Sequence, residues 1–205
     1  MILVSKVDRL KIFIKYKILR LRKRMDVREY WKNPGGGNEP IDYWGHIERS
    51  EFLHRFIDGI IPEDIDIVEL GCNCGRNVFY LNDKGFNVTG MDINPDAVAF
   101  NQGLPIWCQS IEDYFKTNPK ADMYFSMAVL EHLPKESEWI FKEMAKADYV
   151  LTIEDEKSDS GVCFPRDYKK IFESLGMEEL KHETNDDFFV TRYEARLFGK
   201  SIRRG

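Results

Sequence analysis

Long apolar runs are absent from this sequence of 205 residues. No stretch approaches the roughly 20 apolar residues that a membrane-spanning helix needs. The N-terminus also lacks an apolar block followed by small residues, the pattern of a cleaved signal peptide. The composition, 43% apolar and 32% charged, is typical of a soluble globular domain with a substantial core. We therefore expect a cytoplasmic protein, with attachment to a membrane surface as the alternative.

Cysteine is scarce, with four residues at positions 72, 74, 108 and 163. Only Cys72 and Cys74 are close in sequence, and no second pair completes a zinc-binding set. We expect four reduced thiols and no metal site, with metal ligation as the minor alternative.

Positive charge is concentrated at the N-terminus. Residues 1–24 contain nine Lys or Arg and one acid, Asp8, which gives this segment a charge of +8. Because the net charge of the whole chain is −5, the remaining residues together carry −13. Apolar residues recur there at steps of three or four, which predicts an amphipathic helix: they are Leu3, Val7, Leu10, Ile14, Ile18, Leu21 and Met25. The glycine-rich segment 34–40 predicts a hinge. We expect residues 1–45 to form a helical extension with a hinge or lid, and residues 46–205 to form the main domain.

Three interpretations of the basic segment 1–24 stay open. In the first interpretation, it packs on protein, either as a lid or as a dimerisation helix. The dimerisation helix would make the protein a homodimer. It lies on an anionic membrane surface, or it binds RNA phosphates. We favour them in that order, with nucleic acid as the least favoured partner.

Strand-like and helix-like segments alternate from residue 65 onward. This alternation predicts an α/β fold with a doubly wound, mostly parallel sheet of seven strands. The expected strands are 65–70, 87–91, 106–108, 122–127, 148–153, 177–183 and 188–198, and the expected helices are 44–60, 76–84, one from Pro95, 135–145 and 166–175. The last two strands follow each other without a helix, so they pair as a hairpin and the final strand is antiparallel.

Suggestive residues lie at the carboxyl ends of these strands, where open α/β sheets bind ligands. Glu69 is near the end of the first strand, and Gly71, Asn73 and Gly75 follow it; glycine and asparagine there allow the backbone to approach a ligand. Asp92 ends the second strand, where an acid accepts hydrogen bonds from ribose hydroxyls.

The glycine spacing separates the candidate cofactors. A dinucleotide site requires Gly-x-Gly-x-x-Gly, whereas this loop has Gly71 and Gly75 with three residues between them. Glu69 would repel a phosphate but would attract a cationic ligand, such as the amino group and sulfonium of S-adenosylmethionine (SAM).

Four segments, in order, resemble motifs of the class I SAM-dependent methyltransferases. They are residues 67–77, 88–95, 108–113 and 122–134. The resemblance covers residues 65–198 and implies a Rossmann-like fold, SAM as the cofactor and S-adenosylhomocysteine (SAH) as its product.

The resemblance also implies individual roles for the residues in these motifs. Glu69, Gly71, Asn73 and Gly75 would line the methionine and ribose part of SAM, with Asn73 replacing the usual middle glycine. Asp92 would bind the ribose hydroxyls. The adenine would meet Ile93, Ser110 and Ile111, and Ser126 would also belong to the cofactor site.

His132 is the candidate base for acceptors that must lose a proton, because its ordinary pKa suits such chemistry. A helix-capping or packing role is the equal alternative. Glu131 and Glu154 are weaker candidates.

The residues 126–129 lack the Pro-Pro-aromatic turn of enzymes that methylate base amines. We therefore expect an oxygen acceptor on a small molecule, a glycan or a lipid-linked intermediate. The alternatives are a SAM-binding scaffold without catalysis and an RNA-directed methyltransferase.

Four residues are expected to cover the cofactor pocket: Tyr30, Trp31, Tyr43 and Arg49.

Overall fold

The structure is a computed structural model that describes residues 27–32, 39–160, 162–186 and 192–200. The helix expected over residues 3–25 and most of the expected hinge lie outside these residues. Within them, no helix has the length and apolar character needed to cross a bilayer.

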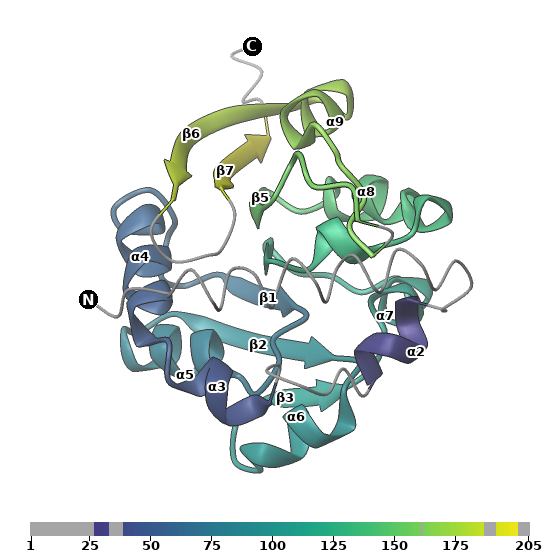
Figure 1. Ribbon diagram of the computed structural model, residues 1–205. Helices are drawn as coiled ribbons and strands as arrows, with labels where there is room; N and C mark the ends of the chain where they lie inside the picture. The colour runs from purple at the N-terminus through teal and green to yellow at the C-terminus, as the bar shows by residue number, and fades with distance from the viewer. Residues whose placement is uncertain (1–26, 33–38, 161, 187–191, 201–205) are drawn as a thin grey trace.

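The centre of the fold is a seven-stranded sheet in the order β3-β2-β1-β4-β5-β7-β6 (Figure 1). The strands are β1 Asp66–Leu70, β2 Asn87–Asp92, β3 Ile106–Cys108, β4 Met123–Met127, β5 Tyr149–Glu154, β6 Met177–Asn185 and β7 Tyr193–Lys200. Strands β1 to β5 are parallel, and β7 is antiparallel to both β5 and β6. The predicted α/β fold with an antiparallel last strand is confirmed.

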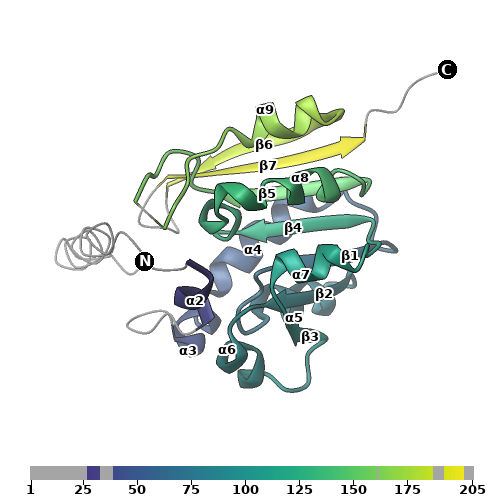
Figure 2. The same ribbon diagram turned by 90° about the vertical axis from the view of Figure 1, so that its right-hand side faces the viewer.

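Helices cover both faces of this sheet because each strand presents alternate residues to opposite sides (Figure 2). Ile67 of β1 packs with helices α4 Ile47–Ile57 and α5 Arg76–Asp83. Its neighbour Val68 packs on the other face with α7 Ile111–Lys116, α8 Trp139–Met144 and α9 Tyr168–Ser174. The remaining helices are α2 Val27–Lys32, α3 Pro40–Trp44, α6 Pro95–Phe100 and the 3₁₀ turns η1 Leu130–His132 and η2 Lys135–Ser137.

Several helix boundaries differ from the sequence-based prediction. Helix α7 is not among the expected helices; Ser110 caps it by accepting a hydrogen bond from the Asp113 amide. The single helix expected over 135–145 is a 3₁₀ turn followed by α8. The helix expected from residue 166 begins at Tyr168, because Asp167 caps it through the Lys170 amide.

The order of the sheet positions the site. Strand β1 lies between β2 and β4, so the connections after β1 and β4 leave toward opposite faces. A crevice forms at such a switch point, at the carboxyl ends of the strands.

Candidate functional site

A cavity opens at the carboxyl ends of β1, β2 and β4. The space within it is about 1100 Å³ when the solvent in its open mouth is included. The loops after these three strands form its floor, and α2 and α3 contribute Trp31 and Tyr43 to its cover. The cavity is therefore the place in the described part of the chain where the residues after β1, β2 and β4 can meet one ligand.

The loop after β1 follows the cavity floor in an unusual backbone conformation. Gly71 has φ +75°, and a Cβ atom added to it would lie 2.5 Å from the Val129 side chain. Asn73 has φ +50°. Glycine at position 71 therefore brings the loops after β1 and β4 together, and any side chain there would be strained and crowded.

Glu69 lies at the bottom of the cavity and is 2% exposed. Its Oε1 accepts a hydrogen bond of 2.6 Å from Asn77 Nδ2, whereas its Oε2 is buried and has no hydrogen-bond partner in the described part of the chain. Burial raises the pKa of Glu69 to about 7, although Asn77 and the nearby Arg76 act in the opposite direction. An unpaired buried carboxylate oxygen of this kind is costly unless a ligand pairs with it.

Asp92 forms the second acidic position, at the end of β2. Its two oxygens accept hydrogen bonds from the backbone amides of Asn73, at 2.7 Å, and Asn94, at 2.8 Å. Burial raises the pKa of Asp92, while these amide bonds lower it. The carboxylate is thus fixed in orientation, and a carboxylate oxygen has a further lone pair for a ligand hydroxyl.

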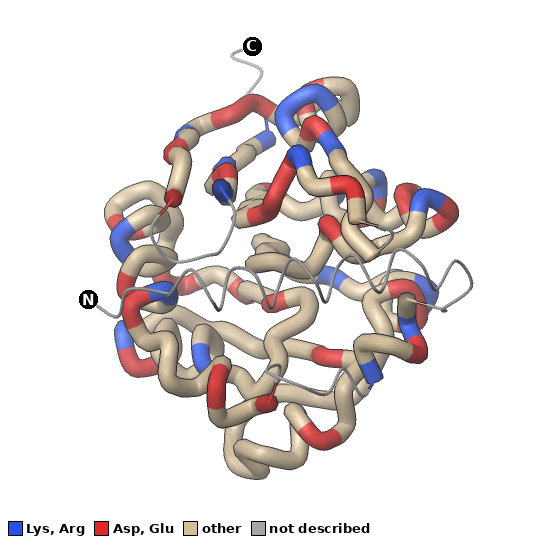
Figure 3. The backbone as a smooth tube through the Cα atoms, viewed as in Figure 1, with Lys and Arg blue, Asp and Glu red and all other residues tan. Residues whose placement is uncertain are grey.

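Positive side chains are absent from the sequence around this second strand. No Lys or Arg occurs between Lys84 and Lys116, and the chain through β2, α6 and β3 is tan and red in Figure 3. A phosphate beside Asp92 would therefore find no counter-charge from this segment, whereas a cationic group there meets Glu69 and Asp92.

The predicted adenine-contacting residues Ile93, Ser110 and Ile111 all line the cavity. Gln109 lies beside them and accepts a hydrogen bond from the Trp107 indole at 3.0 Å. The structure brings this segment next to Asp92, because the Gln109 amide donates to the Asp92 carbonyl oxygen.

Helix α2 is anchored over the cavity mouth by a long-range contact. Arg28 Nε donates to Glu112 Oε1 at 2.8 Å, and Arg28 also donates to Ser137 Oγ. Glu112 accepts a further hydrogen bond from Ser137. This contact fixes α2, and the Trp31 side chain on it, against α7.

Of the four residues predicted to cover the pocket, three line the cavity, namely Trp31, Tyr43 and Arg49. Tyr30 packs edge-on against Trp31. Arg76, which was not predicted, lies beneath this cover and donates to Ser50 Oγ and to the Tyr43 carbonyl oxygen.

His132 lies at the cavity wall formed by η1. Its Nδ1 is 2.7 Å from the Val162 carbonyl oxygen. A carbonyl oxygen only accepts, so Nδ1 carries the proton and Nε2 has the free lone pair. Burial lowers the pKa of His132 to about 4. The ring is therefore neutral at pH 7, and it packs against Trp31 with 4.5 Å between ring centroids.

Glu131 and Ser126 do not line the cavity but lie behind its wall. Glu131 accepts hydrogen bonds from the Asp155 amide and from the Tyr193 hydroxyl, and its Oε1 is 3.4 Å from His132 Nε2. Ser126 donates to Glu154 Oε1 at 2.7 Å. Burial, reinforced by Glu154, raises the pKa of Glu131 well above its ordinary value. Gly75 is also outside the lining and faces Leu104.

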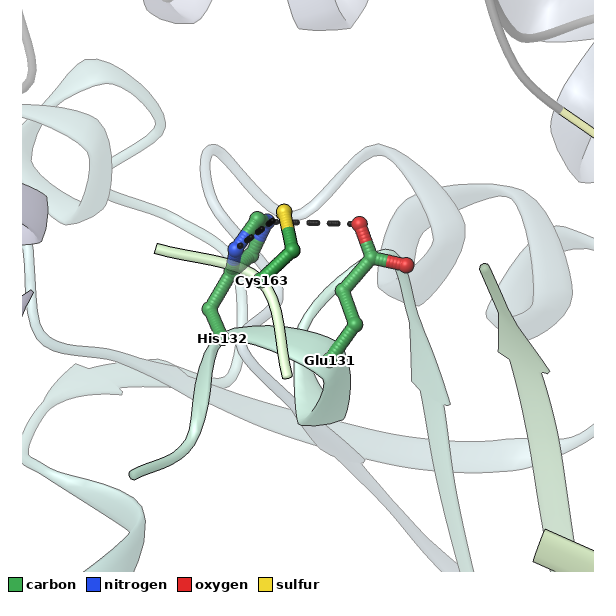
Figure 4. Close-up of side chains that lie close together, drawn as sticks. All are labelled: Glu131, His132 and Cys163. Carbon is green, nitrogen blue, oxygen red and sulfur yellow. Dashed lines mark hydrogen bonds and ion pairs between the residues drawn. The ribbon is translucent and has the colours of Figure 1, made fainter. Parts of the chain in front are cut away.

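A group of possible metal ligands occurs at this wall, where Figure 4 shows Glu131, His132 and Cys163 converging. Their ligand atoms lie within 4.8 Å of one another, and these donors suit zinc. All three already have partners, since His132 donates to Val162, Glu131 accepts from Asp155 and Tyr193, and Cys163 Sγ lies 3.6 Å from His132 Nδ1. A cation would therefore have to displace hydrogen bonds within the chain.

The comparisons with known proteins agree with this geometry. A sequence family described as "Methyltransferase domain" matches residues 68–147, whereas no curated protein sequence matches the chain. Magnesium protoporphyrin IX methyltransferase from Synechocystis PCC 6803, solved with bound SAM, superposes with a TM-score of 0.67 at 17% identity, covering 87% of this chain and 99% of that one. A SAM-dependent methyltransferase from Archaeoglobus fulgidus gives 0.61 at 17% identity, covering 75% and 92%.

These findings define the fold of the protein. Residues 68–147 match the methyltransferase-domain family, and the chain has the fold of the class I SAM-dependent methyltransferases. SAM is the cofactor of this class, as the resemblance of the sequence motifs implies. The structural likenesses, at 17% identity, show the fold and not the acceptor.

Proposed function

We propose that this chain transfers the methyl group of SAM to an oxygen atom of an acceptor bound in the same cavity. One observation carries the proposal: the cavity presents the fixed carboxylate of Asp92 together with the unpaired Oε2 of Glu69. This pair of acids suits a nucleoside that carries both ribose hydroxyls and positive charge.

The residues fit SAM as follows. Asp92 would accept from the ribose hydroxyls, and Ile93, Ser110 and Ile111 would contact the adenine. Glu69 would pair with the amino group, which would supply the partner that Oε2 lacks. The left-handed backbone at Gly71 and Asn73 keeps this loop close to the ligand. We also propose that α2 and α3, within residues 1–45, act as the cover of the site.

When bound, SAM supplies a methyl group on a positively charged sulfur, which needs no further activation. The chain then has to align the acceptor and exclude water. His132 Nε2 is the lone pair at the cavity wall that would receive a proton from the acceptor, and Val162 holds the ring in the required tautomer. Glu131 Oε1 lies 3.4 Å from His132 Nε2 behind the wall, where it would help to orient the ring.

The test is SAH release with isotopically labelled SAM and a panel of hydroxylated acceptors. His132→Ala should lower kcat by at least tenfold, because general base catalysis contributes about 10²–10⁴-fold, while SAM binding stays within threefold. His46→Gln is the matched control, since His46 pairs with Glu48 outside the cavity lining. Unchanged turnover of His132→Ala would remove His132 as the base. Binding of SAM without transfer to any acceptor would instead indicate a non-catalytic SAM-binding protein.

A further inference from the structure

We infer that the acceptor is an aromatic molecule with an acidic hydroxyl group, a phenol in the broad sense, and not a sugar or an aliphatic alcohol. This inference rests on the proposed function and names the substrate class of the same site. It follows from the surface of the cavity around His132.

The part of the cavity beside His132 is largely apolar. We call the five residues Trp31, Val129, His132, Leu133 and Pro134 the acceptor wall. Trp31 and His132 form an aromatic pair whose ring planes meet at 44°, and the other three side chains are aliphatic. A planar apolar molecule packs on such a wall, whereas a sugar needs polar partners for several hydroxyl groups.

Two of the three arginines in the described lining form hydrogen bonds within the chain. Arg28 is paired with Glu112 and Ser137. Arg76 donates to Ser50 and to the Tyr43 carbonyl, and Arg49 neighbours Arg76 and Tyr43 at that same end.

The acceptor wall has one buried donor without a partner. The indole Nε1 of Trp31 is buried and forms no hydrogen bond with any described residue. A buried donor left in this state costs about 1–3 kcal/mol, and the oxygen of a bound acceptor would supply the missing partner. The unpartnered donor of Trp31, on the wall that it shares with His132, suits a single hydroxyl group of the acceptor.

The chemistry of His132 points in the same direction. Burial lowers its pKa to about 4, so it is a weak base. An aliphatic hydroxyl binds its proton about as tightly as water, with a pKa of about 15.7. A phenol, like the tyrosine side chain, has a pKa of about 10. The pKa of a phenol is closer to that of His132 than the pKa of an aliphatic hydroxyl is. Proton transfer from a phenol to His132 therefore costs much less free energy.

The reaction balances with these groups alone. A lone pair of the phenol oxygen forms the new O–CH₃ bond, and the S–CH₃ bond breaks with its electron pair remaining on sulfur, which gives SAH. The phenolic proton passes to His132 Nε2 and then to solvent, because a group with a pKa of about 4 does not keep a proton at neutral pH.

The inference is tested by comparing acceptors with the full chain. The aromatic hydroxyl compounds 2-naphthol and catechol are compared with three other kinds of acceptor: the saturated alcohols that correspond to these two compounds, methyl glucoside, and 2-naphthoate. The aromatic hydroxyl compounds should show kcat/KM at least 100-fold above the other three kinds. Calorimetry of 2-naphthol binding to the SAH-loaded protein gives a second readout that does not depend on turnover.

Substitutions at Trp31 separate its ring from its N–H group. Trp31→Phe should raise the KM and Kd for 2-naphthol about three- to tenfold, and Trp31→Ala should raise both more than tenfold, with smaller changes in kcat. Trp139→Phe is the control, because Trp139 lies on α8, is 41% exposed and does not line the cavity.

Two results would overturn the phenol assignment while leaving methyl transfer standing. One is a higher kcat/KM for the glucoside, the saturated alcohols or the naphthoate, and the other is binding of 2-naphthol that Trp31→Ala leaves unchanged. SAM binding without turnover of either phenol would also count against it. Absence of SAM binding would instead overturn the proposed function itself.

Discussion

Glu69→Gln should stabilise the ligand-free protein at neutral pH and weaken its binding of SAM. Glu69 is 2% exposed, and only one of its oxygens accepts a hydrogen bond from a described residue. Glutamine keeps a carbonyl oxygen for Asn77 and has no charge to bury. Glutamate at this position therefore lowers the stability of the ligand-free protein but favours the binding of a cationic ligand.

The magnitude follows from the pKa of Glu69, which burial raises from 4.5 to about 7. The folded state holds this proton more tightly than the unfolded state, so the free energy of unfolding falls as pH rises from 4.5 to 7. At about 1.4 kcal/mol per pH unit, the full loss is on the order of 3 kcal/mol above pH 7. Glu69→Gln avoids this loss.

Urea denaturation of both proteins between pH 4.5 and pH 8 measures the effect. The variant's advantage should be close to zero at pH 4.5 and should grow to about 2–3 kcal/mol at pH 8. In parallel, SAM should bind the variant about ten- to a hundredfold more weakly, the cost of one hydrogen bond to a charged group. A stability difference that does not change with pH would refute the reasoning.

The remaining predictions concern the loop, the buried acids and the N-terminal segment. Gly71→Ala should lower the free energy of unfolding, measured by chemical denaturation, by about 2–4 kcal/mol. Adding Val129→Ala should restore part of the lost stability, because a Cβ atom at position 71 would meet the Val129 side chain. No recovery in the double variant would show that the new methyl group is not crowded by Val129. Ser126→Ala removes the hydroxyl that donates to Glu154 and should cost about 1–3 kcal/mol by the same assay at pH 8, so an unchanged midpoint would contradict a structural role. Since we favour the protein-packing interpretation of residues 1–24, anionic vesicles should sediment the chain equally with and without them, and loss of binding on their removal would favour the membrane surface.

The fold was predictable because each central strand is a short apolar run followed by a turn, as in β1 and β4. Helix α7 was missed because its six residues are too few to show a helical period, and its capping residue Ser110 was interpreted only as an adenine contact. Residues 188–191, expected at the start of the final strand, lie outside the described residues.

The cofactor side of the site was easier to predict than its cover. Glu69 and Asp92 end parallel strands, so the sheet alone places them together. The direction in which a side chain points was harder to infer: Ser126 bonds Glu154 behind the cavity. Arg28 and Glu112 are 84 residues apart, and no local pattern indicates their pairing.

Calorimetric titration with SAM and with NAD tests the central claim most directly. We expect SAM to bind at one site, Asp92→Asn and Glu69→Gln each to weaken it at least tenfold, and NAD to give no binding heat. Asp96→Asn should change nothing, since Asp96 is exposed and does not line the cavity. Binding of NAD in preference to SAM, or SAM binding that neither substitution weakens, would contradict the account.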